Sequence, residues 1–360
     1  HAGMKNDMRE FIQNEFINGK LDCIVATIAF GMGIDKKDIR RVIHFDLPKS
    51  IENYSQEIGR SGRDGNVSFC EVLANRDRLN TLENFIYGDT PEMDSIYKLF
   101  TLLKNCTDNF IWEIHLSRLS YEMNIRILPL KTLLVYLEME GVIRPKFTYF
   151  DEYSFKYIIE PPEIIKNFSG ERKSFVQTIV ANCQRKKIWT YVDMKGIIST
   201  YNTERTRIIA ALEYFNKMGW IELTTKNAID VYEIINSAFD LDTLTRKMYQ
   251  LFKSKEDIEI KRIHDMVAFF ESDTCLSKKL AEYFGEELEQ SRCGHCSYCR
   301  NGKVEIKLTD VLGPISQFNF TAISNEFKTT MEENFTATTL IKFLCGIYTP
   351  VFSKLKIKQL

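Results

Sequence analysis

The chain has 360 residues, of which 44% are hydrophobic and 27% are charged. This length predicts two or three domains, and the balance of residue types excludes a disordered chain. Lys and Arg (48 residues) nearly cancel Asp and Glu (49 residues), which gives a net charge of −1. A nucleic-acid-binding protein often carries a basic excess, so the composition disfavours one. It still allows a local basic patch, which is sufficient for phosphate contacts.

No run of about 18 apolar residues occurs, so we expect no transmembrane helix, no signal peptide and no membrane partner. Because the chain begins with His1 and stops in a basic and apolar run, Lys354–Leu360, we expect a fragment of a longer protein. We expect a cytoplasmic location. In a bacterium the protein would be associated with the nucleoid, whereas for a eukaryote the sequence predicts no particular compartment. Five of the nine cysteines are isolated, which predicts reduced, mostly buried thiols at Cys23, Cys70, Cys106, Cys183 and Cys345.

Residues 1–90 show the pattern of an α/β domain. The spacing of apolar residues predicts a helix over residues 5–18, which Gly19 ends. Short and nearly unbroken apolar runs are typical of parallel strands that are covered on both faces. Three such runs follow the helix, at Cys23–Phe30, Arg41–Leu47 and Val67–Ala74.

Residues 94–160 predict three helices and a strand, as expected for a winged-helix-like unit. The predicted helices cover residues 95–104, 113–123 and 129–141, and the strand-like alternation covers residues 147–159. Pro161-Pro162 is the predicted linker to the next unit.

Residues 170–237 repeat this scheme. The predicted elements are helices over residues 172–182, 194–199 and 204–218, a strand over residues 188–192, and a two-stranded wing, Trp220–Leu223 with Val231–Ile235. In both units the third helix ends at a glycine that precedes a strand, Gly141 and Gly219, which is a weak internal repeat. Residues 240–303 predict a helical module around a cysteine cluster, and residues 304–360 predict one helix, over residues 336–345.

A cluster of glycines and arginines occupies Ser55-Gln-Glu-Ile-Gly-Arg-Ser-Gly-Arg-Asp-Gly65. Two arginines three residues apart on one helical turn can point the same way, and adjacent glycines allow a phosphate to approach. Arginine side chains of this kind stabilise the charge of phosphoryl transfer. The alternative is a surface loop whose arginines are solvated. Upstream, Gly31, Gly33, Asp35 and Asp46 follow predicted strands, at the edge where open α/β sheets bind ligands.

The segments His1-Ala-Gly, ATIAFGMGID (residues 26–35) and VIHFDLPKSIENYSQEIGRSGRDG (residues 42–65) resemble the later motor motifs of superfamily 2 helicases. The resemblance is specifically to the RecQ family, and it covers residues 1 to about 74. It implies a partial RecA-like motor lobe, with ATP and Mg²⁺ as substrate and DNA as partner.

The resemblance also implies roles for individual residues. Catalytic positions facing the nucleotide are Gln56, Arg60 and Arg63, with Arg63 as the arginine finger. The nucleotide site would include Gly33, Asp35, Gly59 and Gly62, and Thr27 would lie near the DNA phosphates. The chain contains no G-x-x-x-x-G-K-[ST] phosphate loop and no Asp-Glu-x-His box. We therefore expect ATP and Mg²⁺ to be bound mainly by a missing lobe, and the fragment alone to be inactive.

The cysteine cluster consists of Cys293-Gly-His-Cys296-Ser-Tyr-Cys299, with Cys275 earlier in the chain. Two-residue gaps let thiolates meet one ion, so this spacing predicts a four-cysteine metal site. Disulfides, a redox dithiol and an iron–sulfur cluster are the alternatives. Residues 261–275 and 280–286 resemble the RecQ zinc-binding helical hairpin, which implies a structural Zn²⁺ ion. We expect His295 to point outward.

In the familiar RecQ layout the zinc module follows the motor lobe closely, whereas here two winged-helix-like units intervene. The chain therefore resembles a divergent branch, and we place no strand-separating hairpin. The third helix of each unit is the candidate DNA reader. Candidate phosphate contacts are Arg185, Lys186 and Lys187 in the densest basic run, with Arg205 and Arg207 in the second unit. The alternative is that both units are packing spacers with solvated charges.

The predicted fold is thus multidomain, an α/β motor lobe followed by mostly α winged-helix units and a zinc-binding helical hairpin. The predicted function is that of an ATP-dependent 3′–5′ DNA helicase in repair, recombination or replication, acting on single strands and duplex junctions. The alternative is a non-catalytic tandem winged-helix DNA-binding protein with a zinc site. A phosphate loop encoded upstream would discriminate between the two, and the sequence names no protein partner.

Overall fold

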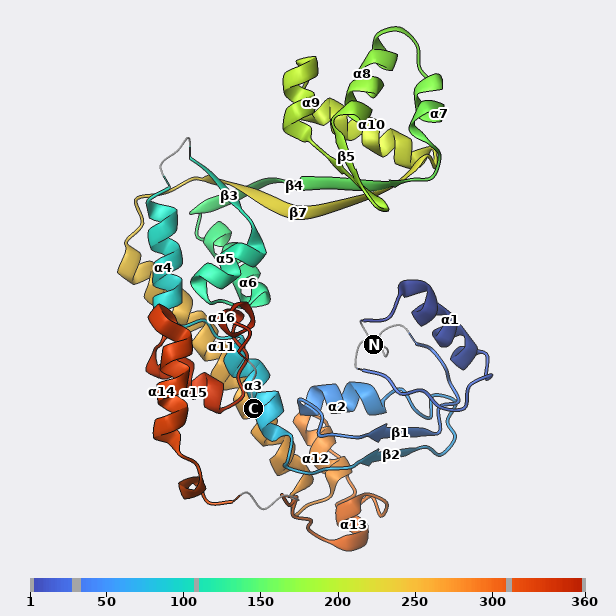
Figure 1. Ribbon diagram of the computed structural model, residues 1–360. Helices are drawn as coiled ribbons and strands as arrows, with labels where there is room; N and C mark the ends of the chain where they lie inside the picture. Colours follow the sequence, from blue (N-terminus) through green and yellow to red (C-terminus); the bar gives the residue numbers. More distant parts are fainter. Residues whose placement is uncertain (1–2, 28–33, 107–109, 309–312, 358–360) are drawn as a thin grey trace. The chain divides into compact units, whose positions relative to one another are not determined.

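The computed structural model describes residues 3–27, 34–106, 110–308 and 313–357 (Figure 1). The chain forms two compact units. One consists of residues His1–Thr90 with Gln250–Leu360, and the other of residues Pro91–Tyr249.

The first unit begins with an α/β segment. Its strands β1 (Arg41–His44) and β2 (Phe69–Val72) pair in parallel, from Arg41 opposite Phe69 to His44 opposite Val72. Its helices are α1 (Asn6–Ile17), α2 (Ile51–Ile58) and α3 (Leu79–Gly88). The predicted first helix and the second and third predicted strands are therefore confirmed.

Three expectations for this segment are wrong. Residues 23–27 form no strand, while residues 28–30 lie outside the described residues. The strands are not covered on both faces, because Ile43 is 55% exposed and Phe69 is 48% exposed. The two isolated cysteines of this segment, Cys23 and Cys70, are exposed and not buried, and the three elsewhere in the chain are half-buried or exposed. Apolar runs predict burial only where another layer of structure covers the strands, and the described strands form a sheet of only two.

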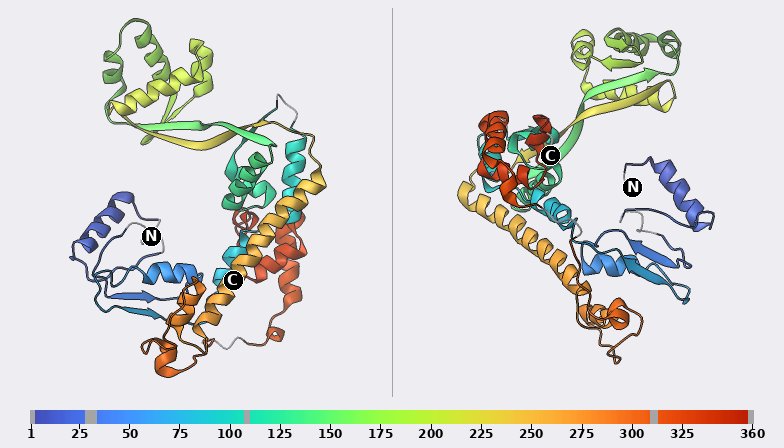
Figure 2. Two further views of the ribbon diagram at one scale, coloured as in Figure 1. Left: turned by 180° about the vertical axis from the view of Figure 1, so that it is seen from behind. Right: turned by 60° about the horizontal axis from the view of Figure 1, so that its bottom comes forward.

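The second half of this unit is helical. Helix α11 (Leu241–Phe270), which belongs to this unit from Gln250 onward, leads into α12 (Leu276–Tyr283) and α13 (Ser297–Asn301), and Figure 2 shows the last two at the end of α11. Helices α14 (Phe320–Met331), α15 (Ala337–Leu344) and α16 (Pro350–Lys354) follow, of which only α15 was predicted. Among the described residues, no helix is both long enough and apolar enough to span a membrane.

The C-terminal half of α11 packs against the α/β segment. Val267 shares a buried cluster with Leu47 and Ile306. Glu271, just beyond the helix, accepts hydrogen bonds from Arg76 Nη2 at 2.8 and 2.9 Å, and from the backbone N–H of Ile306 at 2.9 Å. One carboxylate therefore joins three segments that are far apart in the sequence.

The second unit contains a five-stranded antiparallel sheet in the order β3-β7-β4-β6-β5. Its strands are β3 (Ile111–Ile114), β4 (Ile143–Tyr157), β5 (Cys183–Lys186), β6 (Trp189–Val192) and β7 (Ile221–Ile234). Its helices are α4 (Met93–Lys104), α5 (Leu116–Met123), α6 (Ile127–Met139), α7 (Pro161–Lys166), α8 (Gly170–Ala181), α9 (Met194–Tyr201) and α10 (Arg205–Lys217).

The long strands β4 and β7 pair with each other from Ile143 opposite Ile234 to Tyr157 opposite Ile221. The predicted two-stranded wing is therefore wrong, because both of its parts belong to the single strand β7. Strand β4 of the predicted unit 94–160 pairs with strand β7 of the predicted unit 170–237, so one sheet joins the two predicted units. The winged-helix assignment stays a prediction. The internal repeat has a physical basis, since Gly141 and Gly219 adopt φ of +68° and +72° after α6 and α10.

Two smaller predictions for this unit are also wrong. Residues 111–114 are strand β3 and not the start of a helix, and β3 pairs with β7. Pro161-Pro162 starts α7 instead of forming a linker, which suits the fixed φ of proline in a first helical turn. Helices α7–α10 lie on one side of the sheet (Figure 1). Their core contains Phe175, Ile197 and Leu212, packed on Phe155 of β4.

We expect Glu271→Ala to destabilise the first unit by about 2–3 kcal/mol. The change removes a charge-assisted bidentate pair and leaves the half-buried donors of Arg76 and Ile306 without their acceptor. Urea unfolding monitored by circular dichroism measures the difference. The matched control is Lys261→Ala, which breaks an exposed i,i+4 pair with Asp265 and should cost under about 0.5 kcal/mol. Equal effects of the two changes would contradict the linking role of Glu271.

Candidate nucleotide-binding loop and metal centre

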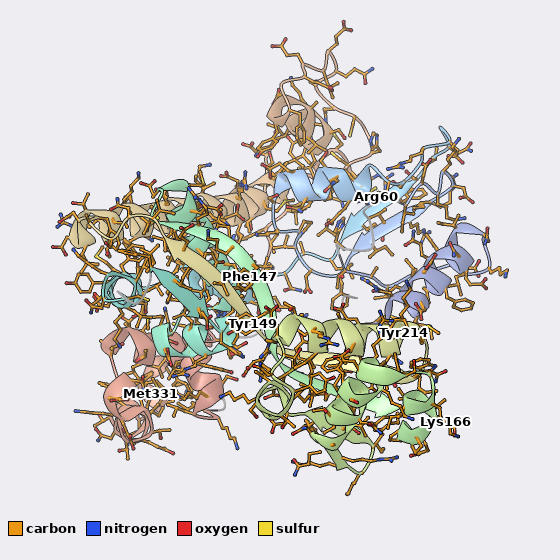
Figure 3. All side chains as sticks on the ribbon, turned by 90° about the horizontal axis from the view of Figure 1, so that it is seen from above. Arg60, Phe147, Tyr149, Lys166, Tyr214 and Met331 are labelled. Atoms are coloured by element: carbon orange, nitrogen blue, oxygen red, sulfur yellow. The ribbon has the colours of Figure 1, made fainter. Side chains whose placement is uncertain are left out.

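The two predicted catalytic arginines lie in a loop after α2, which we call the arginine loop (residues 59–67). Helix α2 begins at the N-cap Ser50, whose Oγ accepts a hydrogen bond from the N–H of Asn53. It ends at Gly59, so Arg60 and Arg63 do not share a helical turn as predicted. Figure 3 shows Arg60 near the end of α2. Gln56 is exposed on the last turn of this helix.

The backbone of the arginine loop is held by hydrogen bonds around Gly62. Its N–H donates to the carbonyl of Ile39 at 3.0 Å, which ties the loop to the start of β1. Its φ is +65°, and a Cβ atom there would lie 2.8 Å from Ser68 Oγ. Ser68 in turn donates to Ser61 Oγ at 3.1 Å. Gly62 is therefore required by the fold of the loop itself.

A second brace holds the far side of the arginine loop. The Asp64 carboxylate accepts hydrogen bonds from the side chains of Asn66 and Arg40, and these bonds lower its pKa to about 2. Arg40 also donates to the carbonyls of Asn66 and Val67. The Arg40 guanidinium thus contacts Asp64, Asn66 and Val67 of the loop. The Asp64 carboxylate stays ionised at neutral pH.

The structure brings together Arg63 and Asp35, two residues that were each predicted to lie near the nucleotide. Arg63 Nη1 lies 3.0 Å from Asp35 Oδ1, and Arg63 Nε donates to the carbonyl of Gly59 at 3.3 Å. The Arg63 and Asp35 side chains are 37% and 74% exposed, so a ligand in solvent can reach both. Thr27 is exposed, and Gly33 lies outside the described residues.

The inner face of helix α2 contacts residues for which the sequence analysis predicted no role. His44 Nε2 on β1 donates to Glu57 Oε2 at 2.6 Å, three residues before Arg60. The Tyr54 ring lies 5.6 Å from that of His44 and 5.9 and 5.3 Å from those of Phe269 and Phe270. Burial raises the pKa of the Tyr54 hydroxyl to about 12. Helical spacing from Ile51 to Tyr54 was the signal in the sequence that pointed to this inner face.

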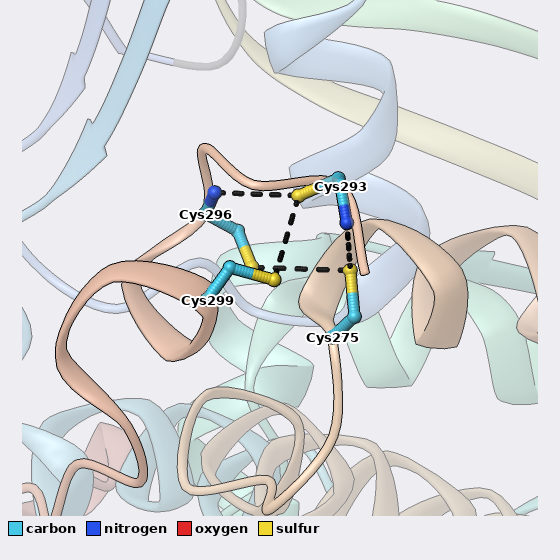
Figure 4. A group of neighbouring side chains, drawn as sticks. All are labelled: Cys275, Cys293, Cys296 and Cys299. Carbon is cyan, nitrogen blue, oxygen red and sulfur yellow. Dashed lines mark hydrogen bonds between the residues drawn. The ribbon is translucent and has the colours of Figure 1, made fainter. Parts of the chain in front are cut away.

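The four predicted cysteine ligands converge at the end of α11. Their sulfur atoms all lie within 4.8 Å of one another, with 3.9 Å between Cys293 and Cys299 and 4.0 Å between Cys275 and Cys296 (Figure 4). Four thiolates about 2.3 Å from a zinc ion would stand roughly 3.8 Å apart in a tetrahedron. A disulfide needs a separation of about 2.05 Å. The donor set therefore fits a tetrahedral metal and not a pair of disulfides.

The loop carrying the cysteines favours the thiolate at Cys293, whereas burial raises the pKa of Cys296 to about 11. The N–H of Cys293 donates to the sulfur of Cys275, and the N–H of Cys296 to that of Cys293, both at 3.3 Å. Partial burial raises the pKa of Cys293, but hydrogen bonds from Ser277 and from backbone N–H groups outweigh it and lower this pKa to about 5. His295 is exposed and its Nδ1 pairs with the carbonyl of Cys293, so it points outward as predicted.

The candidate DNA contacts of the second unit divide into two groups. Arg205 donates to the Phe150 carbonyl and stacks on Tyr149, and Arg207 forms a bidentate pair with Glu171 at 2.7 and 2.8 Å. These contacts use both guanidinium groups within the unit. The second group lies on the β5–β6 hairpin, where Arg185, Lys186 and Lys187 are exposed.

Two family models match the chain at these sites. Residues 1–65 match the helicase conserved C-terminal domain, and residues 239–300 match the RecQ zinc-binding domain. The first match covers most of the arginine loop, and the second covers all four cysteines.

The chain is similar in sequence to several proteins that are named as helicases. The chain is 25% identical over 273 residues to the ATP-dependent DNA helicase Q-like 5 of Arabidopsis thaliana, covering 74% of this chain and 29% of that protein. It is 46% identical over 104 residues to the bifunctional 3′-5′ exonuclease/ATP-dependent helicase WRN of Mus musculus (29% of this chain, 7% of that protein). It is 59% identical over 73 residues to the RecQ-like DNA helicase blm-1 of Caenorhabditis elegans (20% of this chain, 7% of that protein).

The chain thus spans less than a third of the length of these relatives. The two family matches are far apart in the sequence, yet the first match and residues 250–300 of the second belong to the same compact unit. Together with the arginine loop and the four-cysteine centre, these matches support a C-terminal region of a RecQ-family superfamily 2 helicase.

Proposed function

We propose that the chain acts as the C-terminal part of an ATP-dependent DNA helicase of 3′–5′ polarity. The observation that carries this proposal is the Arg63–Asp35 pair in a braced loop, within the unit that also holds the four-cysteine centre. The relatives described above, which are ATP-dependent helicases by name, support the same activity. A DNA-binding regulator without catalysis would have no use for the arginine loop.

In this proposal Arg63 is the residue that senses ATP. Its guanidinium is paired with Asp35 and remains partly exposed, so it can exchange this partner for the γ-phosphate. Because hydrogen bonds already hold the backbone of the arginine loop in place, the loop needs little reorganisation when charge develops in the transition state. Gly59 supports Arg63 through its carbonyl, and Arg60 and Gln56 would complete the contacts with the nucleotide. Thr27 would contact the DNA phosphates.

The four cysteines would hold one Zn²⁺ ion, which supplies folding free energy and no chemistry. Their spacing in the structure suits tetrahedral coordination by thiolates. An iron–sulfur cluster is the alternative occupant, because it also uses four cysteines. Zinc is favoured because the matching family model is that of the RecQ zinc-binding domain.

DNA is the proposed partner, and the basic run Arg185–Lys187 is the proposed phosphate contact of the second unit. Support comes from its position on an exposed hairpin. The internal contacts of Arg205 and Arg207 favour a packing role for these two residues.

We expect the purified 360-residue chain to contain about one zinc ion and to be colourless. Cys296→Ser should lower the zinc content and the thermal midpoint together, because metal binding at this site is folding free energy. Elemental analysis and thermal unfolding measure both quantities. Cys23→Ser, at an exposed isolated cysteine, should change neither. Visible absorbance near roughly 400 nm would identify an iron–sulfur cluster and contradict the zinc assignment.

In the full-length protein, we expect Arg63→Ala to reduce ATP turnover by about a thousandfold while ATP affinity changes little. An arginine that meets the γ-phosphate mainly in the transition state affects kcat and not ground-state binding. Steady-state ATPase assays and nucleotide titrations separate the two quantities. The control is Arg78→Ala, an exposed arginine paired with Asp46, which should retain turnover. Near-normal turnover of Arg63→Ala would refute its role and favour Arg60.

A further inference from the structure

The sheet of the second unit has two unlike faces around β6. Directly opposite residues on paired strands point to the same face, and alternate residues point to opposite faces. Thr190 is opposite both Phe155 and Arg185, which places these residues on the face that α7–α10 cover. Trp189 and Tyr191 therefore point to the other face, which we call the open face.

The open face carries aromatic rings flanked by lysines. Lys156 Nζ lies 4.5 Å from the centroid of the Trp189 ring, and Lys186 Nζ lies 5.3 Å from that of the Tyr191 ring. Tyr191 is 37% exposed. In the core cluster of this unit the aromatic residues of the sheet are Tyr153, Phe155 and Tyr157, all from the covered face. The two rings of the open face thus contribute nothing to that core.

The charges of the open face fit an anionic ligand. Lys156 has an ion-pair partner in Glu222 at 3.0 Å, but its ammonium group also lies over Trp189. Lys186 is exposed beside the hairpin turn, where Lys187 adopts a positive φ of 46°. Glu222 therefore offsets the charge of Lys156. Among the described residues, Lys186 and Lys187 of the hairpin form no ion pair with an acidic side chain, so the hairpin keeps a positive charge.

We propose that the open face, centred on Trp189 and Tyr191, binds single-stranded DNA. Unpaired bases can stack on the two rings while the lysines contact the phosphates, which is how proteins hold single strands without reading their sequence. A duplex does not offer its base faces for such stacking. In a helicase, this surface would hold one of the separated strands, so the proposal rests on the proposed helicase function.

The proposal separates the roles of rings and lysines in a binding experiment. The probe is a fluorescein-labelled oligo-dT of about 20 nucleotides, titrated with the 360-residue chain at several salt concentrations. Tyr191→Ala should weaken binding by about fivefold or more, since each stacked base contributes substantially. Because a ring carries no charge, the dependence of log K on log[salt] should keep its slope.

The lysine variants should behave in the opposite manner. Lys156→Ala with Lys186→Ala should reduce the salt slope by between about 0.7 and 1.4, because Lys186 contributes roughly 0.7 as one phosphate contact on a single strand and Lys156, already paired with Glu222, contributes less. Lys166→Ala is the matched control, because Lys166 lies on α7, away from the open face, and pairs with Glu163 at 2.6 Å. It should change the affinity and the slope less than the double variant does.

A second readout reports on this face alone, since other parts of the chain can also bind DNA. Trp112 is 5% exposed and Trp220 belongs to the core cluster, which leaves Trp189 as the tryptophan of the open face. Adding oligo-dT should quench tryptophan fluorescence in the unmodified chain, and Trp189→Phe should abolish this quenching. Circular dichroism confirms that each variant is folded.

Unchanged affinity in Tyr191→Ala, or quenching that persists in Trp189→Phe, would overturn the proposal. Tighter binding of a blunt duplex than of oligo-dT would also overturn it. Failure of the proposed motor function is a separate result, because loss of ATPase activity in the full-length protein leaves these binding measurements unaffected. Arg63→Ala, which is in the other unit, should bind oligo-dT through the open face with normal quenching.

Discussion

The first unit depends on the packing of Tyr54 between two distant parts of the chain. Its ring contacts His44 of β1 on one side and Phe269 and Phe270 at the end of α11 on the other. Helix α2, which carries Tyr54, ends directly before the arginine loop. The position of the two predicted catalytic arginines therefore depends on a helix that the zinc module helps to hold, and not on the two-stranded sheet alone.

This arrangement gives a physical reason for a four-cysteine site in the same unit as the arginine loop. The segment after α11 has few buried side chains, and no residue of α12 is buried. Because the apolar area that it buries is small, such a segment would depend for its stability on a metal ion held by its four cysteines. Tyr283 of α12 donates to Glu52 of α2 at 2.7 Å, so the order imposed by the cysteines reaches α2 through a direct contact. The zinc module thus supports the arginine loop physically, without taking part in its chemistry.

The sequence predicted the local features of this chain far better than its long-range pairing. The cysteine spacing predicted a four-sulfur centre because a metal site fixes its own geometry. The ion pair between Arg63 and Asp35 was not predicted, although both residues were expected near the nucleotide. The β4–β7 pairing was missed because more than 60 residues separate the paired ends, and no local pattern encodes such a partner. The burial of the isolated cysteines was wrong for a related reason. Whether an apolar strand is buried depends on the layers that cover it, which periodicity within the strand does not reveal.

The pairing of β4 and β7 also explains how the second unit accommodates a helical segment between them. Residues 158–220 leave from Tyr157 and return at Ile221, which are opposite each other in the register. Because the strand pair already holds these two ends together, closing the intervening segment costs little additional conformational entropy. The inserted helices then use one face of the sheet for their core, through Tyr153, Phe155 and Ile221. Core formation therefore accounts for the aromatic residues on the covered face, whereas Trp189 and Tyr191 on the open face require an explanation outside the core, such as a ligand.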